Sequence, residues 1–202
     1  MVDLTDLPRM IMPAALTGLL REALAEISPP EGASDDRVAA VVSGPGGGSW
    51  HLGVSEGAFE LVEGVCEEPL LTLSVTVADW REFVAGRVRD VVKASAPPHL
   101  LQPSAITKLQ GSGERAERLR AFSGDIQVIL EDDEEDAEYC ATLTLGAQPP
   151  RPDAPTTTVR LDLDYLAKLA SGDENVQSAF FAGKIKIEGD MNLAMSVMTA
   201  MI

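Results

Sequence analysis

The chain has 202 residues, 45% of them hydrophobic, which is enough for one large domain or two small ones with a real core. Its formal net charge is −16, from 32 acidic and 16 basic residues. This charge argues against nucleic-acid binding and against strong binding to anionic membranes, because both need clustered Lys and Arg. No apolar run approaches the roughly 20 residues that span a bilayer. An acidic N-terminus and two widely separated cysteines, Cys66 and Cys140, predict a reducing, cytoplasmic location.

The first half of the chain reads as a helix followed by short strands. Residues 13–27 carry apolar side chains at helical spacing, begin with Pro13 and end before two prolines, which predicts an amphipathic helix. Alternating or apolar runs then predict strands at 38–42, 50–54, 58–62 and 71–77. A short helix is expected at 79–85, ending at Gly86.

A similar pattern returns with an offset of 86 residues. Between residues 69–86 and 155–172, three of eight aligned positions are identical, and most of the others are apolar in both copies. The second copy is preceded by a predicted helix at 115–122 and strands at 125–130 and 139–145. The first copy is followed only by residues 87–92, which we expect to form a lone strand.

The expected organisation therefore consists of two unequal, related halves packed as a pseudo-dimer. A proline-rich stretch separates them and reads as a linker. The predicted boundaries are an N-terminal helix at 1–34, an abbreviated half at 35–93, a linker at 94–112 and a complete domain at 113–202.

The sequence contains little that indicates a catalytic site or a metal site. The two histidines, His51 and His99, lie in a predicted strand and in the linker, and there is no GxSxG motif. Asp162 is better explained as the N-cap of a helix at 163–170 than as one of a pair of catalytic carboxylates. Seven of the eight residues 131–138 are acidic, but Ala137 stands where a calcium loop needs glycine, so we expect a mobile surface loop. The sequence predicts no catalytic residues, no metal and no cofactor.

Residues 177–195 are the most informative segment. They predict a short helix ending at Gly183, a strand at 184–188, a turn at Gly189 and a second helix capped by Asp190. The residue order SAFFxGKIKIxGxMxLAM resembles the C-terminal signature of the sterol carrier protein family, the non-specific lipid-transfer proteins. The resemblance implies an α+β fold, in which a mixed sheet of about five strands is covered by helices on one face and encloses an apolar cavity. It also implies binding of sterols, fatty acids, acyl thioesters or phospholipids without catalysis.

The predicted ligand wall combines this signature with an apolar stripe on the last helix. Methionines recur there at intervals of four and three residues, and their flexible side chains suit irregular ligands. Two inward isoleucines of the strand at 184–188 and two leucines of the predicted helix at 163–170 complete the set. The expected ligand-binding residues are Phe180, Phe181, Ile185, Ile187, Met191, Met195, Met198, Leu166 and Leu169.

Two functions from different classes remain open at this stage. The first is non-catalytic binding, or transfer, of a lipid or other apolar ligand in an internal cavity. The alternative is a ligand-free scaffold, in which the cavity is filled and the apolar face of 13–27 docks a protein partner or a second copy of the chain.

Overall fold

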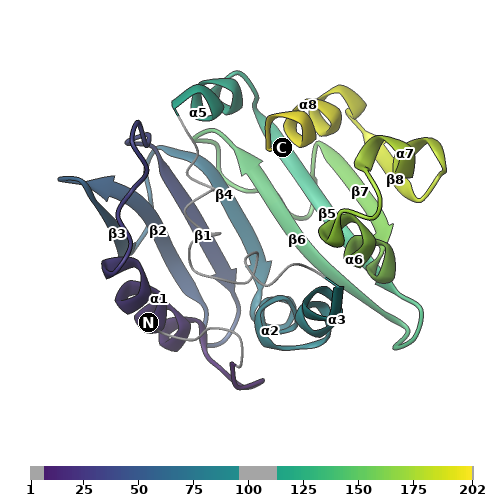
Figure 1. Ribbon diagram of the computed structural model, residues 1–202, viewed down its shortest axis with the longest axis horizontal. Coiled ribbons are helices and arrows are strands. Elements are labelled where there is room, and N and C mark those ends of the chain that lie inside the picture. Colours follow the sequence, from purple (N-terminus) through teal and green to yellow (C-terminus); the bar gives the residue numbers. More distant parts are fainter. Residues whose placement is uncertain (1–6, 96–112, 202) are drawn as a thin grey trace.

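A single eight-stranded sheet runs through the whole molecule (Figure 1). The computed structural model describes residues 7–95 and 113–201. The sheet order is β3-β2-β1-β4-β6-β5-β7-β8, with β1 parallel to β4, β5 parallel to β7, and all other neighbours antiparallel. The strands are β1 (Arg37–Ser43), β2 (Gly48–Ser55), β3 (Ala58–Glu63), β4 (Pro69–Thr76), β5 (Gly124–Asp132), β6 (Ala137–Leu145), β7 (Thr157–Asp162) and β8 (Ile185–Gly189).

The helices cover one face of this sheet, so the predicted α+β class is confirmed. Figure 1 shows α1, α6 and α8 in front of the strands. The helices are α1 (Pro13–Ala25), α2 (Val77–Ala85), α3 (Arg87–Ser95), α5 (Gly113–Arg120), α6 (Leu163–Ser171), α7 (Val176–Phe181) and α8 (Met191–Met201). The predicted linker, 94–112, lies largely outside the described residues, as does His99.

The strands β1, β2 and β4 are arranged in the sheet like β5, β6 and β7, although the first half has the additional strand β3 between β2 and β4 in the chain. In each set an antiparallel hairpin is followed by a strand that lies parallel to the first strand of the hairpin and next to it. Both ends of α6 lie 86 residues after those of α2, which matches the offset in the sequence. The sets lie side by side, joined by antiparallel pairing of β4 with β6. The sheet has eight strands rather than about five because the first half adds four of its own. That the halves are copies of one domain stays a prediction.

The predicted lone strand at 87–92 is wrong, because the structure has a helix there. Val88, Val91 and Val92 recur at helical spacing, and Val88 is buried in the main core. Helix α3 packs against α2 and α6. An alternation of basic and apolar residues over only three positions, 87–89, fits both a strand and a helix, and the tertiary contacts decide between them.

The acidic segment 131–138 is more ordered than a mobile loop would be. Both strands of the hairpin extend into it, through Asp132 on β5 and from Ala137 on β6, which leaves a turn of only four residues. The Asp132 side chain is buried, and Arg87 Nε on α3 donates to its Oδ2 at 2.8 Å. Arg87 also donates to Glu134 Oε2 at 2.6 Å. The prediction failed because it did not foresee a counter-charge 45 residues away.

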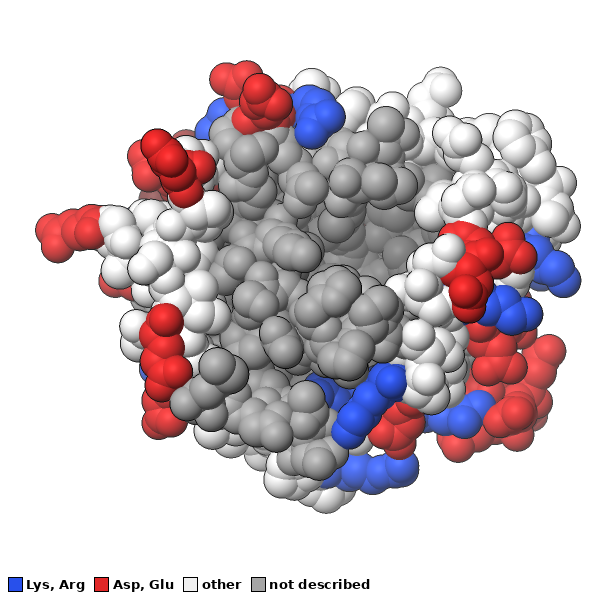
Figure 2. Space-filling view, viewed as in Figure 1, with Lys and Arg blue, Asp and Glu red and all other residues white. Residues whose placement is uncertain are grey.

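Cations from the neighbouring strands also reach this hairpin. Arg160 Nη1 on β7 lies 2.9 Å from Glu138 Oε1 and 3.4 Å from Glu131 Oε1. Lys186 Nζ on β8 lies 3.8 Å from Glu131 Oε2. Figure 2 shows the resulting mixture of acidic and basic side chains at the lower right of the molecule. The described residues bring no three His, Cys, Asp or Glu side chains together in a group suited to a metal ion.

We expect Arg87→Met to destabilise the protein more at pH 7 than at pH 4. Arg87 lowers the pKa of Asp132 below its ordinary value of 3.8, mainly through their hydrogen bond. The ionised pair therefore stabilises the fold above that pH, and its contribution is lost as the pH falls through the lower folded-state pKa. In the variant the buried carboxylate has no counter-charge, so its pKa should rise and protonation should relieve the penalty at acid pH.

Urea unfolding of both proteins at the two pH values measures this difference. Arg9→Met is the matched control, because Arg9 pairs with Asp90 at the surface. An equal loss of stability at pH 7 and pH 4 in Arg87→Met would contradict the assignment.

Candidate functional site

The most unusual part of the helix-covered face is its centre. A row of apolar side chains crosses five neighbouring strands there, as the strand registers show. The outer members are buried, yet Leu73 in the middle is 42% exposed. The row is Trp50 on β2, Ala40 on β1, Leu73 on β4, Leu143 on β6 and Ile126 on β5.

The exposure of Leu73 is not shared by its neighbours along β4. Leu71 and Val75 project to the same face, two residues away on either side, and both are buried. Leu71 belongs to the larger core cluster, beneath α3, α5, α6 and α8, whereas Val75 belongs to a smaller one beneath α1 and α2. Leu73 therefore lies between two packed cores, and neither cluster of described residues includes it.

Such a place suits an apolar ligand better than a chemical reaction. A large hydrophobic side chain in the middle of a wide sheet is normally buried, since burying it stabilises the fold by about 1.5–3 kcal/mol. Ala40 and Leu143, on either side of Leu73 in the row, are only half-buried. An acyl chain or ring system laid across this row would remove all three from water.

The sequence-predicted ligand residues lie elsewhere, at the β7–β8 end of the sheet. Ile185 is buried in the larger core cluster. Ile187, Leu166 and Leu169 pack against that cluster and are half-buried. Phe180 is also half-buried and makes an edge-on contact with Phe181, at 5.8 Å between ring centroids.

The other members of the predicted set are more exposed or fall on α8. Phe181 is 86% exposed, and Met191 is exposed as well. Met195 is half-buried, and the side chain of Met198 lies outside the described part of the chain. Among the described side chains of α8, those of Leu193, Ala194 and Val197 are buried and pack into the core. The assignment of ligand contacts to the predicted set stays a prediction.

The local structure of this segment follows the sequence closely. Gly183 has φ 69° just after α7, as expected for a left-handed position past a helix end. Asp190 Oδ1 accepts from the Leu193 N–H at 3.0 Å, which is the predicted N-cap of α8. Asp162 likewise caps α6, by accepting from the Tyr165 N–H at 3.1 Å. Here the local signals and the tertiary fold agree.

Sequence reasoning missed the central row because it depends on strand pairing across the two halves. Leu73 and Leu143 are neighbours only because β4 pairs with β6. The alternation of apolar and polar residues within β4 or β6 does not indicate which strand lies beside it. The only available signal was the strand alternation itself, which places Leu71, Leu73 and Val75 on one face.

The comparisons with known proteins agree with the signature. Residues 105–201 match the model of the SCP-2 sterol transfer family, which confirms the resemblance found at 177–195. No curated protein matches the chain significantly. Within the described part of the chain, no helix is long and apolar enough to cross a membrane.

Several solved structures are similar to parts of the chain. The solution structure of the sterol carrier protein domain 2 of Helicoverpa armigera is 22% identical, over 57% of this chain and 85% of its own, with a TM-score of 0.38. Sterol carrier protein 2 from Yarrowia lipolytica, in its apo form, is 18% identical over 58% of this chain and 88% of its own, with a TM-score of 0.35. Sterol carrier protein 2 like 2 from Aedes aegypti is 18% identical over 44% of this chain and 93% of its own, with a TM-score of 0.31.

Proposed function

We propose that this protein, whose residues 105–201 match the SCP-2 sterol transfer family, binds a lipid or other apolar molecule between its helices and the sheet. The observation that carries the proposal is the exposure of Leu73 at the centre of the helix-covered face. The ligand lies across the row that contains Ala40, Leu73 and Leu143. Fatty acids, fatty acyl groups and sterols are the chemical classes that such a surface accommodates.

Binding without catalysis is part of the proposal. The proposed ligand is held and released unchanged, as expected of a carrier in the cytoplasm.

The sequence-predicted residues form a second part of the proposal. Leu166, Leu169, Phe180, Ile187 and Met195 are half-buried, and these are the ones that we expect to approach a ligand that extends toward β8. Ile185 is already packed in the core, whereas Phe181 points largely to solvent. These last two should therefore contribute least to affinity.

The scaffold alternative is weakened by the position of α1. Leu16 and Leu19, on its apolar side, pack against the smaller core cluster. Arg21 Nε also donates to the carbonyl oxygen of Leu61 on β3, at 2.8 Å. This side of the helix is used inside the molecule rather than left open for a partner.

Native mass spectrometry of the purified protein tests the proposal directly. We expect a mass addition that organic extraction removes, and displacement of a fluorescent fatty acid from the extracted protein by unlabelled fatty acid. Bound ligand should also raise the melting temperature, because it binds only the folded state. Absence of co-purified lipid together with absence of fluorescent fatty-acid binding would contradict the proposal.

A further inference from the structure

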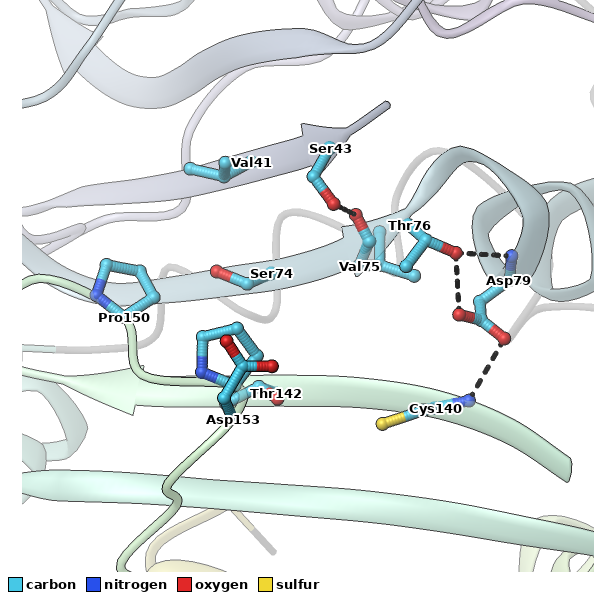
Figure 3. Close-up of a pocket in the computed structure, with 11 residues that line it drawn as sticks. Val41, Ser43, Ser74, Val75, Thr76, Asp79, Cys140, Thr142, Pro150 and Asp153 are labelled. Atoms are coloured by element: carbon cyan, nitrogen blue, oxygen red, sulfur yellow. Dashed lines mark hydrogen bonds between the residues drawn. The ribbon is translucent and has the colours of Figure 1, made fainter. Parts of the chain in front are cut away.

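The face of the sheet opposite the helices carries a pocket of about 470 Å³ (Figure 3). This volume is in the range of small-molecule sites. Side chains of β1, β4 and β6 form its floor, and the connection between β6 and β7 forms one wall. Its lining residues are Val41, Ser43, Ser74, Val75, Thr76, Asp79, Cys140, Thr142, Pro150, Pro152 and Asp153.

The pocket lies where β4 and β6 separate. Their pairing stops at Ser74 and Thr142, and beyond this point the first turn of α2 reaches β6 instead. Asp79 Oδ1 accepts from the Cys140 N–H at 3.3 Å, while its Oδ2 accepts from the Thr76 hydroxyl at 2.7 Å. The hydrogen bonds of Asp79 therefore take the place of β4–β6 pairing where the two strands separate.

The wall formed by the β6–β7 connection is fixed in position. Asp125, which is fully buried, accepts from the Thr144 hydroxyl at 2.7 Å and from Arg151 Nε at 3.0 Å. The backbone N–H of Arg151 donates to the same carboxylate at 3.3 Å. Gln127 Nε2 donates to the carbonyl oxygen of Pro152 at 2.8 Å. The prolines beside these anchors add rigidity, so the pocket is formed before any ligand arrives.

The Ser74 hydroxyl in this pocket is a buried polar group that no described residue pairs with. Ser74 is only 9% exposed, and its Oγ makes no hydrogen bond. Buried hydroxyls are normally paired, so this one is available to bond to water or to a polar group of a ligand in the pocket. Figure 3 shows Ser74 on β4 and Thr142 on β6, with Pro150 and Asp153 of the connection beside them.

The charges around the pocket disfavour the binding of anions. Both charged residues in its lining, Asp79 and Asp153, are acidic. Arg151, the nearest cation along the connection, is bound to Asp125. Arg160, the cation facing Cys140, is bound to Glu131 and Glu138 on the same sheet. Asp79 is occupied by its own hydrogen bonds, whereas the Asp153 side chain is exposed to solvent.

We propose that this pocket binds a small molecule with an apolar body and a protonated amine. The ammonium group pairs with Asp153, the apolar body lies against Val41 and the two prolines, and a polar group of the ligand bonds to the Ser74 hydroxyl. The site is separate from the lipid site, because the sheet stands between them.

A set of three probes of equal size tests the charge selection: benzylamine, benzyl alcohol and benzoate. Each is titrated into the full chain and followed by the amide chemical shifts of β4, β6 and residues 146–156. We expect saturable shifts confined to these segments, with benzylamine binding at least about threefold more tightly than benzyl alcohol and benzoate binding weakest.

Asp153→Asn should lower the benzylamine affinity to that of benzyl alcohol. Asp133→Asn, which changes the net charge equally in the exposed hairpin, should leave it unchanged. Ser74→Leu should block all three probes by filling the pocket; if that variant does not fold, the two aspartate variants decide the question alone.

Three results would overturn the proposal. These are absence of saturable shifts at millimolar benzylamine, binding of benzoate as tight as that of benzylamine, and equal loss of affinity in both aspartate variants. A fluorescent fatty acid should stay bound during the titration, so the result is independent of the lipid site.

Discussion

Replacing Leu145 with alanine should lower the free energy of unfolding by about 2–5 kcal/mol. Leu145 is fully buried and lies opposite Leu71 of β4 and Gly124 of β5, at the junction of the two halves of the sheet. Removing its side chain leaves a cavity in the larger core cluster, and the surrounding strands cannot close around it. Urea unfolding, monitored by circular dichroism, measures the loss.

Leu73→Ala is the matched control, with the same substitution on the neighbouring strand and the same face. Its expected cost is about 1 kcal/mol, because Leu73 is 42% exposed and loses less burial. A cost equal to that of Leu145→Ala would show that Leu73 is packed as tightly as the core. The site proposed at the centre of the sheet would then be wrong.

Replacing Leu73 with glutamine should weaken fatty-acid binding by about tenfold or more, with little effect on the stability of the empty protein. Glutamine has a similar size, but its amide would lie against the acyl chain without a hydrogen-bond partner. A loss of about 1.4 kcal/mol of binding free energy corresponds to this change. Displacement of a fluorescent fatty acid gives the affinity, and thermal melts without ligand give the stability.

Val65→Gln controls for a general effect of polar substitution. Val65 is exposed in the connection between β3 and β4, next to a smaller pocket on the opposite face of the sheet. We expect its fatty-acid affinity to equal that of the unchanged protein. Unaltered affinity in Leu73→Gln, or an equal loss in both variants, would contradict the position proposed for the ligand.

Local signals in the sequence predicted most of the secondary structure. Alternation identified β4 and β8, and capping residues identified the start of α6 and α8, because these features depend only on neighbouring residues. The segment 177–195 indicated the resemblance to the sterol carrier protein family, and the match at 105–201 confirms this resemblance. The two acceptors Asp162 and Asp190 cap the helices as expected.

Features that depend on distant residues could not be predicted in this way. The helix α3 forms where a strand was expected, because its valines pack against the core. Asp132 is buried because Arg87 approaches from another element. Met191 on α8 is exposed, although the spacing of the methionines alone predicts that it faces inward. In each case, contacts with elements that are distant in the sequence decide which side of an element is inside.

The position of the ligand is the central claim, and a spin-labelled fatty acid such as doxyl-stearate tests it most directly. Paramagnetic broadening of backbone amides reports which residues lie near the bound chain. We predict the strongest broadening at Ala40, Leu73 and Leu143, in the middle of the helix-covered face, and its reversal by unlabelled stearate. Broadening confined to β8, α7 and α8, with sharp signals from these three residues, would contradict the account.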